Sequence, residues 1–194
     1  MTRKVTIDIL GAARLCADAF FHDPLDSYFF PDEATRFEKQ VALYNFFIRT
    51  NLRNVIVTSD KIEGIALVER PMDHQSSLTT SSLASGFSLL TLGISTIRKM
   101  IAYQLTATQK QKALIKDPFW YVRIIAVDPR YQHSGYASRL LRPVLQEATA
   151  RREPVFLETH NSANLPLYEH LGFAVIDQTV LRDSGLVHYC MVRK

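Results

Sequence analysis

The chain has 194 residues and is 47% hydrophobic, with 23 Lys or Arg against 19 Asp or Glu and a formal net charge of +4. This length and apolar content are enough for one domain, residues 1–194, with a core that needs no disulfide or metal to hold it together. The basic residues are spread along the chain and form no run with interleaved aromatics, so the net charge does not predict a nucleic-acid partner.

The N-terminal part of the chain is predicted to contain a strand, two helices and a hairpin. Residues 5–8 alternate as a short strand does, and residues 10–20 have the spacing of a helix. A second helix is predicted over residues 31–51, because apolar residues return to one face every three or four positions. Two β-rich runs, 55–58 and 62–69, flank a turn and predict a hairpin. We expect this hairpin to be the central antiparallel pair of the sheet.

A long segment, residues 72–116, follows and is predicted to be a helical insertion. Its apolar residues trace a helical stripe that consists of Leu83, Phe87, Leu90, Ile94, Ile97 and Ile101. This stripe predicts a helix packed on the core, with a helix on a membrane surface as the alternative. The next run, residues 119–127, is almost continuously aromatic or β-branched, which predicts a strand buried on both faces.

The C-terminal part alternates helices and strands again. The predicted elements are a helix at 136–150, a strand at 155–159, a short helix at 165–171, and a closing strand pair at 173–180 and 186–192. Pro143 lies inside the first of these helices and should kink it. Because helices and strands alternate through the whole chain, we expect a mixed α/β fold.

The two cysteines, Cys16 and Cys190, lie near opposite ends of the chain and lack the spacing of a metal or redox site. We therefore expect two buried free thiols, no bound metal and a cytoplasmic location. The N-terminus does not have the pattern of a secretion signal, because Asp8 interrupts its apolar stretch. The uncharged stretch between residues 73 and 98 is too rich in Ser and Thr for a membrane span.

A strand, a loop and a helix follow one another at residues 119–150, with Gly135 at the end of the loop. Successive N–H groups of such a loop, together with the helix N-terminus, offer hydrogen-bond donors and a positive dipole to a phosphate. The loop reads Gln132-x-x-Gly135-x-Ala137 and follows a strand that ends at Val127. This pattern resembles the pyrophosphate-binding signature of the GNAT superfamily of N-acetyltransferases.

A second pattern downstream is similar to another motif of the same superfamily. It has Asn164, Tyr168 and the pair Gly172-Phe173 at the motif's spacing, and the two motifs together lie within residues 119–180. The resemblance implies a single GNAT-type domain. Its central sheet would be twisted, mostly antiparallel, flanked by helices, and splayed between its fourth and fifth strands, which correspond to residues 119–127 and 155–159.

The resemblance also implies which residues bind acetyl-CoA as co-substrate. Backbone groups at the end of the strand would pair with the pantetheine arm, the loop amides would hold the pyrophosphate, and an asparagine would bind the arm. The implied acetyl-CoA-binding residues are Ile125, Ala126, Val127, Gln132, His133, Ser134, Gly135, Tyr136, Ala137, Ser138, Asn164 and Tyr168.

The implied reaction is direct attack of a neutral primary amine on the thioester in a ternary complex, without a covalent acyl-enzyme. Tyr168 would protonate the leaving thiolate. Some members of the superfamily use a glutamate as the base at the position where this chain has Tyr121. Glu158, His160, His188 or a water chain are the remaining candidates. We choose Glu158 as the catalytic base because it ends a strand that borders the splay.

Residues 19–25, 30–32 and 141–145 resemble the branch of the superfamily that contains puromycin N-acetyltransferase. The superfamily implies that residues 19–32 and 72–116 shape the acceptor site, and we expect the acceptor to be a small-molecule amine. A protein or peptide acetyltransferase and a non-catalytic acyl-CoA sensor are the alternatives. We expect no nucleic-acid or membrane partner, and a homodimer is one of the oligomeric states that the sequence leaves open.

Overall fold

The computed structural model describes residues 7–71 and 91–194. The predicted strand at 5–8 and the first part of the predicted insertion therefore lie largely outside the described residues. The described chain begins with three helices, each preceded by an aspartate whose side chain accepts a hydrogen bond from a backbone N–H of the first turn. These are α1 (Ile9–Ala19) after Asp8, α2 (Pro24–Phe29) after Asp23 and α3 (Glu33–Thr50) after Asp32. The helices α1 and α3 were predicted, whereas the six-residue α2 was not.

The described residues form one sheet of six strands in the order β1-β2-β3-β4-β6-β5. Neighbouring strands are antiparallel except β3 and β4, which run parallel. The strands are β1 (Val55–Val57), β2 (Gly64–Glu69), β3 (Trp120–Val127), β4 (Val155–Thr159), β5 (Ala174–Val180) and β6 (Val187–Arg193). The predicted mixed α/β fold with a mostly antiparallel sheet is confirmed.

The hairpin of β1 and β2 forms as predicted, but it is not the centre of the sheet. Within the described residues β1 is the last strand on one side, and β2 pairs with β3. The prediction was wrong because a hairpin pattern specifies only local pairing. The position of a hairpin in its sheet depends on partners far along the chain.

The strands β3 and β4 separate along their length, as the resemblance implied. Their pairing ends at Val122 and Leu157, although β3 continues to Val127. At the same level the β2–β3 ladder skips Arg123, because Leu67 pairs with Ile124 and the next residue of β2 pairs with Val122. Such a bulge exchanges the faces to which the later side chains of a strand point.

The prediction that β3 is buried on both faces was wrong. Its side chains alternate between buried and half-buried, and the half-buried ones are Tyr121, Arg123, Ile125 and Val127. All four border cavities, although Tyr121 and Ile125 also pack against core clusters. The continuous apolar run therefore belongs to a strand whose alternate residues line cavities.

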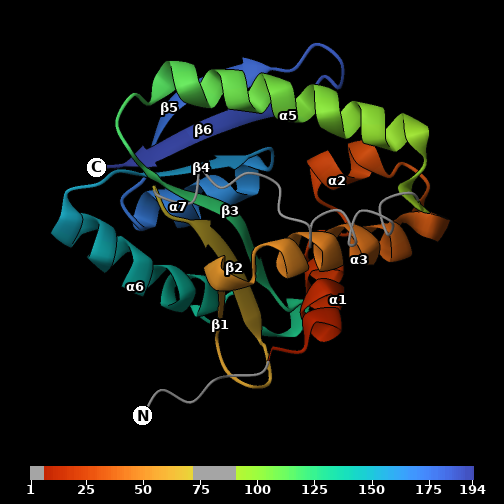
Figure 1. Ribbon diagram of the computed structural model, residues 1–194, viewed down its shortest axis with the longest axis horizontal. Coiled ribbons are helices and arrows are strands. Elements are labelled where there is room, and N and C mark those ends of the chain that lie inside the picture. The colour runs from red at the N-terminus through yellow and green to blue at the C-terminus, as the bar shows by residue number, and fades with distance from the viewer. Residues whose placement is uncertain (1–6, 72–90) are drawn as a thin grey trace.

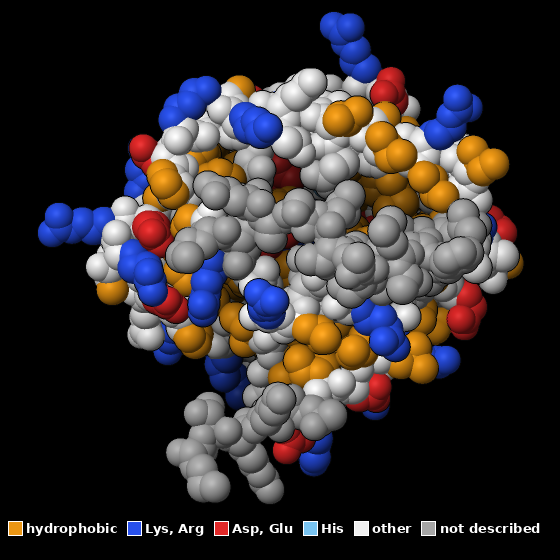
Figure 2. Space-filling view, in the orientation of Figure 1, with side chains coloured by type: hydrophobic (Ala, Val, Ile, Leu, Met, Phe, Trp, Pro, Cys, Tyr) orange, Lys and Arg blue, Asp and Glu red, His pale blue; other side chains and the backbone are white. Residues whose placement is uncertain are grey.

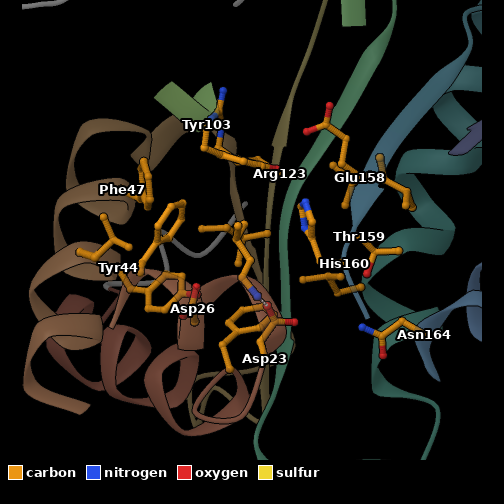
Figure 3. Close-up of a pocket in the computed structure, with 18 of the residues that line it drawn as sticks. Asp23, Asp26, Tyr44, Phe47, Tyr103, Arg123, Glu158, Thr159, His160 and Asn164 are labelled. Atoms are coloured by element: carbon orange, nitrogen blue, oxygen red, sulfur yellow. Dashed lines mark hydrogen bonds between the residues drawn. The ribbon is translucent and has the colours of Figure 1, made fainter. Parts of the chain in front are cut away.

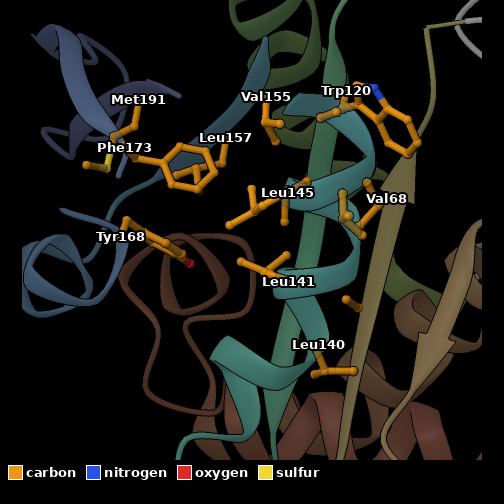
Figure 4. Packing of buried hydrophobic residues seen from close by; sticks show 14 residues of the cluster. Val68, Trp120, Leu140, Leu141, Leu145, Val155, Leu157, Tyr168, Phe173 and Met191 are labelled. Atoms are coloured by element: carbon orange, nitrogen blue, oxygen red, sulfur yellow. The ribbon is translucent and has the colours of Figure 1, made fainter. Parts of the chain in front are cut away.

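Helices cover both faces of the sheet. On one face, Leu141 and Leu145 of α6 (Tyr136–Arg151) point toward the sheet and pack with Leu157 (Figure 4). The helix α6 continues through Pro143. Tyr168 of α7 (Leu165–His170) belongs to the same cluster. On the other face, α1 and α3 pack against residues of β2 and β3.

The long helix α5 (Ile94–Leu114) crosses from α2 to β5 (Figure 1). Near its N-terminus, the hydroxyl of Thr96 donates to the carbonyl of Phe29 at 3.3 Å. Near its C-terminus, Lys110 Nζ lies 2.5 Å from the Asp177 carboxylate on β5. These contacts fix α5 at both ends across the side of the sheet where β3 and β4 separate.

The predicted stripe on this segment is only partly correct. Leu83, Phe87 and Leu90 lie outside the described residues, and Ile97 contacts the core, but the side chains of Ile94 and Ile101 are 79% and 56% exposed. The packed face instead follows Ile97, Met100, Tyr103 and Ala107. The helix has apolar residues on two faces, so spacing alone could not identify the packed one. The orange side chains at the upper right of Figure 2 lie over the outer face of α5.

Two further expectations concern the cysteines and the membrane. Cys16 and Cys190 are both buried free thiols, as predicted. Across residues 7–71 and 91–194, no helix combines the length and the apolar character that crossing a membrane would require.

Candidate active site

The loop between β3 and α6 has the backbone of an anion site. Gly135 has a φ of 77°, in the left-handed region, and α6 begins at the next residue. No side chain caps the first N–H groups of α6, and its first turn has no acidic residue. Such an uncapped N-terminus favours a phosphate. A Cβ on Gly135 would meet no atom within 4 Å, so the positive φ, rather than crowding, requires glycine here.

This loop borders a cavity of about 610 Å³, which we call the loop cavity. The end of β3, the residues after α1 and the start of α7 form its other walls. Of the predicted acetyl-CoA-binding residues, those that line it are Ile125, Ala126, Val127, Gln132, His133, Gly135, Tyr136, Ala137, Ser138, Asn164 and Tyr168. Ser134 does not line it, and its hydroxyl donates to the Gln132 carbonyl at 3.3 Å.

A second cavity of about 180 Å³, which we call the inner cavity, adjoins the loop cavity. Figure 3 shows Asp23, Asp26, Tyr44 and Phe47 on one side of it and Glu158 and His160 on the other. The wall is rich in aromatic rings and has three carboxylates and one guanidinium, that of Arg123, which is paired with Glu69. The aromatic rings and carboxylates include Phe20, Phe29, Tyr44, Phe47, Tyr103, Tyr121, His160, Tyr168, Asp23, Asp26 and Glu158. Carboxylates and the faces of aromatic rings both attract a cationic amine.

The two cavities meet at residues that line both of them, namely Phe20, Asp23, Ile125, Asn164 and Tyr168. Tyr168 is buried at this junction, and burial raises the pKa of its hydroxyl, with a further contribution from Asp23. The hydroxyl is therefore protonated at neutral pH. A group in this position can donate a proton to a ligand that extends from one cavity into the other.

Glu158 borders the inner cavity but not the loop cavity. Its Oε2 accepts a hydrogen bond from the Tyr121 hydroxyl at 3.1 Å. The two residues lie on β4 and β3, so the bond spans the gap between the separating strands. The Tyr121 hydroxyl therefore fixes the orientation of the Glu158 carboxylate beside the inner cavity.

The two histidines named as alternative bases lie beside Glu158. His160 borders the inner cavity, and the fully buried His188 stacks on it with a centroid distance of 4.8 Å. Burial, and then the neighbouring His188, lower the pKa of His160 to about 3. His160 is therefore neutral and a weak base near pH 7. His188 does not border either cavity, which leaves Glu158 as the best-placed acceptor of a proton.

Sequence analysis did not identify Asp23 and Asp26 as site residues, although it assigned residues 19–32 to the acceptor site. Asp26 Oδ2 accepts bonds of 2.7 Å from the Tyr44 hydroxyl and from Gln40 Nε2. Burial raises the pKa of Asp26 to about 7 and also raises the pKa of Asp23. Two carboxylates within an aromatic-rich run were the available signal.

Replacing Asp26 with asparagine should change how stability depends on pH. The folded protein binds a proton at Asp26 between about pH 4 and pH 7, where the unfolded chain has released it, so wild-type stability should fall as pH rises through this window. The slope is at most about 1.4 kcal/mol per pH unit. Asp26→Asn keeps an oxygen for Tyr44 and Gln40 but does not titrate. Denaturant unfolding at several pH values should show a flatter profile for the variant, and equal slopes would contradict the assignment.

Known proteins that resemble this chain in sequence or in fold are acetyltransferases. The model of the acetyltransferase (GNAT) family matches residues 94–173. An uncharacterized N-acetyltransferase of Schizosaccharomyces pombe is 26% identical over 189 residues, which cover 93% of this chain and 76% of that protein. The N-alpha-acetyltransferase RimI of Mycobacterium tuberculosis is 43% identical over 81 residues, which cover 39% of this chain and 50% of that protein.

A crystal structure of histone acetyltransferase HPA2 and related acetyltransferase from Corynebacterium glutamicum has the same fold. It superposes with a TM-score of 0.63 at 20% identity and covers 96% of this chain and 90% of that one. At this identity the likeness concerns the fold alone. The chain therefore has the fold of this acetyltransferase, and residues 94–173 are similar to the GNAT family.

Proposed function

We propose that this chain, an acetyltransferase of the GNAT type, transfers the acetyl group of acetyl-CoA to the primary amine of a small molecule. One observation carries the proposal. A cavity built on a phosphate-type loop meets a cavity lined by carboxylates and aromatic rings, and Tyr168 lies at the junction. A donor and an acceptor bound in these two cavities would face each other at one protonated hydroxyl.

The loop cavity suits acetyl-CoA. The uncapped start of α6 and the left-handed Gly135 offer backbone N–H groups to a pyrophosphate. The residues Ile125, Ala126 and Val127 continue beyond the last β3–β4 pair and border the same cavity, where an extended pantetheine arm would lie beside the strand. Asn164 lines both cavities and would bind that arm close to the thioester.

Acetyl-CoA supplies the acetyl group as a thioester. In the proposed reaction one residue of this chain accepts a proton and another donates one. Glu158, positioned by Tyr121, accepts the proton that the amine must lose before or during attack, directly or through a water. As the new C–N bond forms and the C–S bond breaks, the Tyr168 hydroxyl donates its proton to the thiolate. Both groups act from fixed positions, and no covalent acyl-enzyme is required.

The inner cavity supports a small acceptor. Its volume of about 180 Å³ fits a compact amine, and α2, α3 and α5 all contribute to its wall. Aromatic rings would bind an apolar or aromatic body, and the carboxylates of Asp23 and Glu158 would attract the amine. Residues 19–25 and 141–145 support placement in the branch that contains puromycin N-acetyltransferase. The RimI relative, an N-alpha-acetyltransferase, favours a peptide amine as the second candidate.

The deciding experiment is turnover of acetyl-CoA, measured as free thiol, with separate panels of small aromatic and aliphatic amines, polyamines, amino acids and peptides. We expect the small apolar amines to give the highest kcat/KM. A preference for peptides would overturn the small-molecule proposal. Binding of acetyl-CoA without turnover of any amine would favour a non-catalytic acyl-CoA sensor.

Glu158→Gln should lower kcat by about 100-fold near neutral pH, the usual worth of one positioned base. Glutamine keeps an oxygen for the Tyr121 hydroxyl but cannot take a proton. Raising the pH should restore much of the lost rate, because a larger share of the amine then arrives neutral. The check is a pH profile of kcat/KM for both proteins, and a loss that does not vary with pH would show that Glu158 is not the base.

A further inference from the structure

Glu158, His188 and Cys190 bring a carboxylate, an imidazole and a thiol together behind the inner cavity. Glu158 of β4 lies directly opposite Cys190 in the antiparallel ladder with β6. His188 precedes Cys190 by two residues, so the three side chains project from the same face of the sheet. One potential ligand atom from each residue lies within 4.8 Å of the other two.

His188 Nε2 is within hydrogen-bond reach of the Cys190 sulfur but too far from the Glu158 carboxylate for a hydrogen bond. His188 Nε2 lies 3.6 Å from Glu158 Oε1 and 3.8 Å from Cys190 Sγ, whereas N–H···O bonds measure about 2.7–3.2 Å. Around a tetrahedral Zn²⁺ the ligand bonds of about 2.0–2.3 Å place neighbouring ligand atoms about 3.3–3.7 Å apart. The two separations from His188 are therefore close to those around Zn²⁺, whereas the three atoms as a set lie only within 4.8 Å of one another, so an ion would have to draw them slightly together.

Burial makes the cluster unusual as a set of polar groups. His188 and Cys190 are fully buried, and the Glu158 side chain is 6% exposed. Glu158 Oε1 is buried and has no hydrogen-bond partner in the described part of the chain. An unpartnered buried carboxylate oxygen is costly, and a cation between it and His188 would remove that cost.

The neighbours of the three side chains bear on how Glu158 is held and on what could be a fourth ligand. Tyr121 donates to the other carboxylate oxygen of Glu158, as partners of metal ligands commonly do. Asp177 on β5 is also paired with Cys190, but its carboxylate is bound by Lys110 and Thr179 and is not free to be a fourth ligand. Glu158 borders the inner cavity, so an ion could enter there and a water could take the fourth position.

We propose that Glu158 Oε1, His188 Nε2 and Cys190 Sγ form a site for one Zn²⁺ ion, with the fourth position open to the inner cavity. A thiolate, an imidazole and a carboxylate are a ligand set that Zn²⁺ accepts. On binding, the Cys190 thiol releases its proton to solvent and the S–Zn bond forms. Because Glu158 is then occupied, the bound ion should inhibit the acetyl transfer. That inhibition, unlike the binding, rests on the proposed function.

Cobalt(II) is the probe for the site, because a bound thiolate gives Co²⁺ a charge-transfer band in the near ultraviolet. Tag-free full-length protein is stripped with a chelator and titrated with Co²⁺. We expect the band to saturate at one equivalent and to disappear when Zn²⁺ is added. Cys190→Ala should abolish the band. Cys16→Ala removes the other buried thiol, which lies in a separate cluster with α1 and α3, and should keep it.

The absence of a thiolate band in the wild-type protein, or its survival in Cys190→Ala, would overturn the site. If Cys190→Ala does not fold, equilibrium dialysis of Zn²⁺ with His188→Asn is the alternative test. This variant should bind less Zn²⁺ than the wild type, and equal binding would overturn the site. Turnover separates the two proposals. Zn²⁺ should reduce wild-type turnover, a chelator should restore it, and Cys190→Ala should be active and insensitive to Zn²⁺. A cobalt band in a protein that acetylates no amine would leave the metal site standing and reject the proposed function.

Discussion

Tyr168→Phe should lower kcat by about 100-fold and leave the Kd for acetyl-CoA nearly unchanged. Tyr168 lines both cavities, and burial keeps its hydroxyl protonated. Phenylalanine keeps the ring that packs edge-on against Phe173 with a centroid distance of 6.1 Å and loses only the hydroxyl group with its proton. The effect should therefore fall on the chemical step and not on binding. The thiol of CoA is a fair leaving group, so about 100-fold is the upper part of the expected range.

The measurement is kcat at saturating acetyl-CoA and amine, with calorimetric titration of acetyl-CoA and thermal unfolding on the same samples. Tyr189→Phe is the matched control, because Tyr189 lines neither cavity and the same atom is removed. A control as slow as Tyr168→Phe would show that the loss is not specific to the junction. Equal kcat values for Tyr168→Phe and the wild type, with the chemical step shown to limit the rate, would remove Tyr168 from the mechanism.

The sequence could predict which residues line the loop cavity because that part of the structure is local. The segment from Gln132 to Ser138 is a loop that continues into the first turn of α6, and Asn164 and Tyr168 lie on one short helical stretch. Their relative positions follow from short-range backbone geometry, which spacing in a sequence reports well. Ser134 is the exception, since alternate residues of a turning loop need not face the same side.

The inner cavity could not be predicted at the same detail because distant segments assemble it. Asp26 of α2, Tyr103 of α5 and Glu158 of β4 meet only when α5 crosses the open side of the sheet. Two local features of the structure also had no signal in the amino-acid sequence. The skipped residue Arg123 in the β2–β3 ladder depends on the partner strand, and the packed face of α5 depends on which of its two apolar sides meets α2.

Gly135→Val should abolish detectable acetyl-CoA binding while the domain stays folded. Gly135 has a φ of 77°, and a β-branched residue strongly disfavours this region. The variant can relieve the strain only by changing the backbone of the loop, and this would turn the N–H groups at the start of α6 away from the phosphates. A Cβ at this position meets no atom within 4 Å, so the core should be unaffected.

Gly185→Val separates loss of the loop conformation from general strain. Gly185 has a φ of 71°, its Cβ would also meet nothing within 4 Å, and it lies in the turn before β6, outside both cavities. Both variants should lose a similar stability, on the order of 1–3 kcal/mol, because each forces a branched side chain into the left-handed region. Only Gly135→Val should lose acetyl-CoA in a calorimetric titration. Unchanged affinity in Gly135→Val would show that the loop does not hold the pyrophosphate, and equal losses in both variants would attribute the effect to stability and not to the loop.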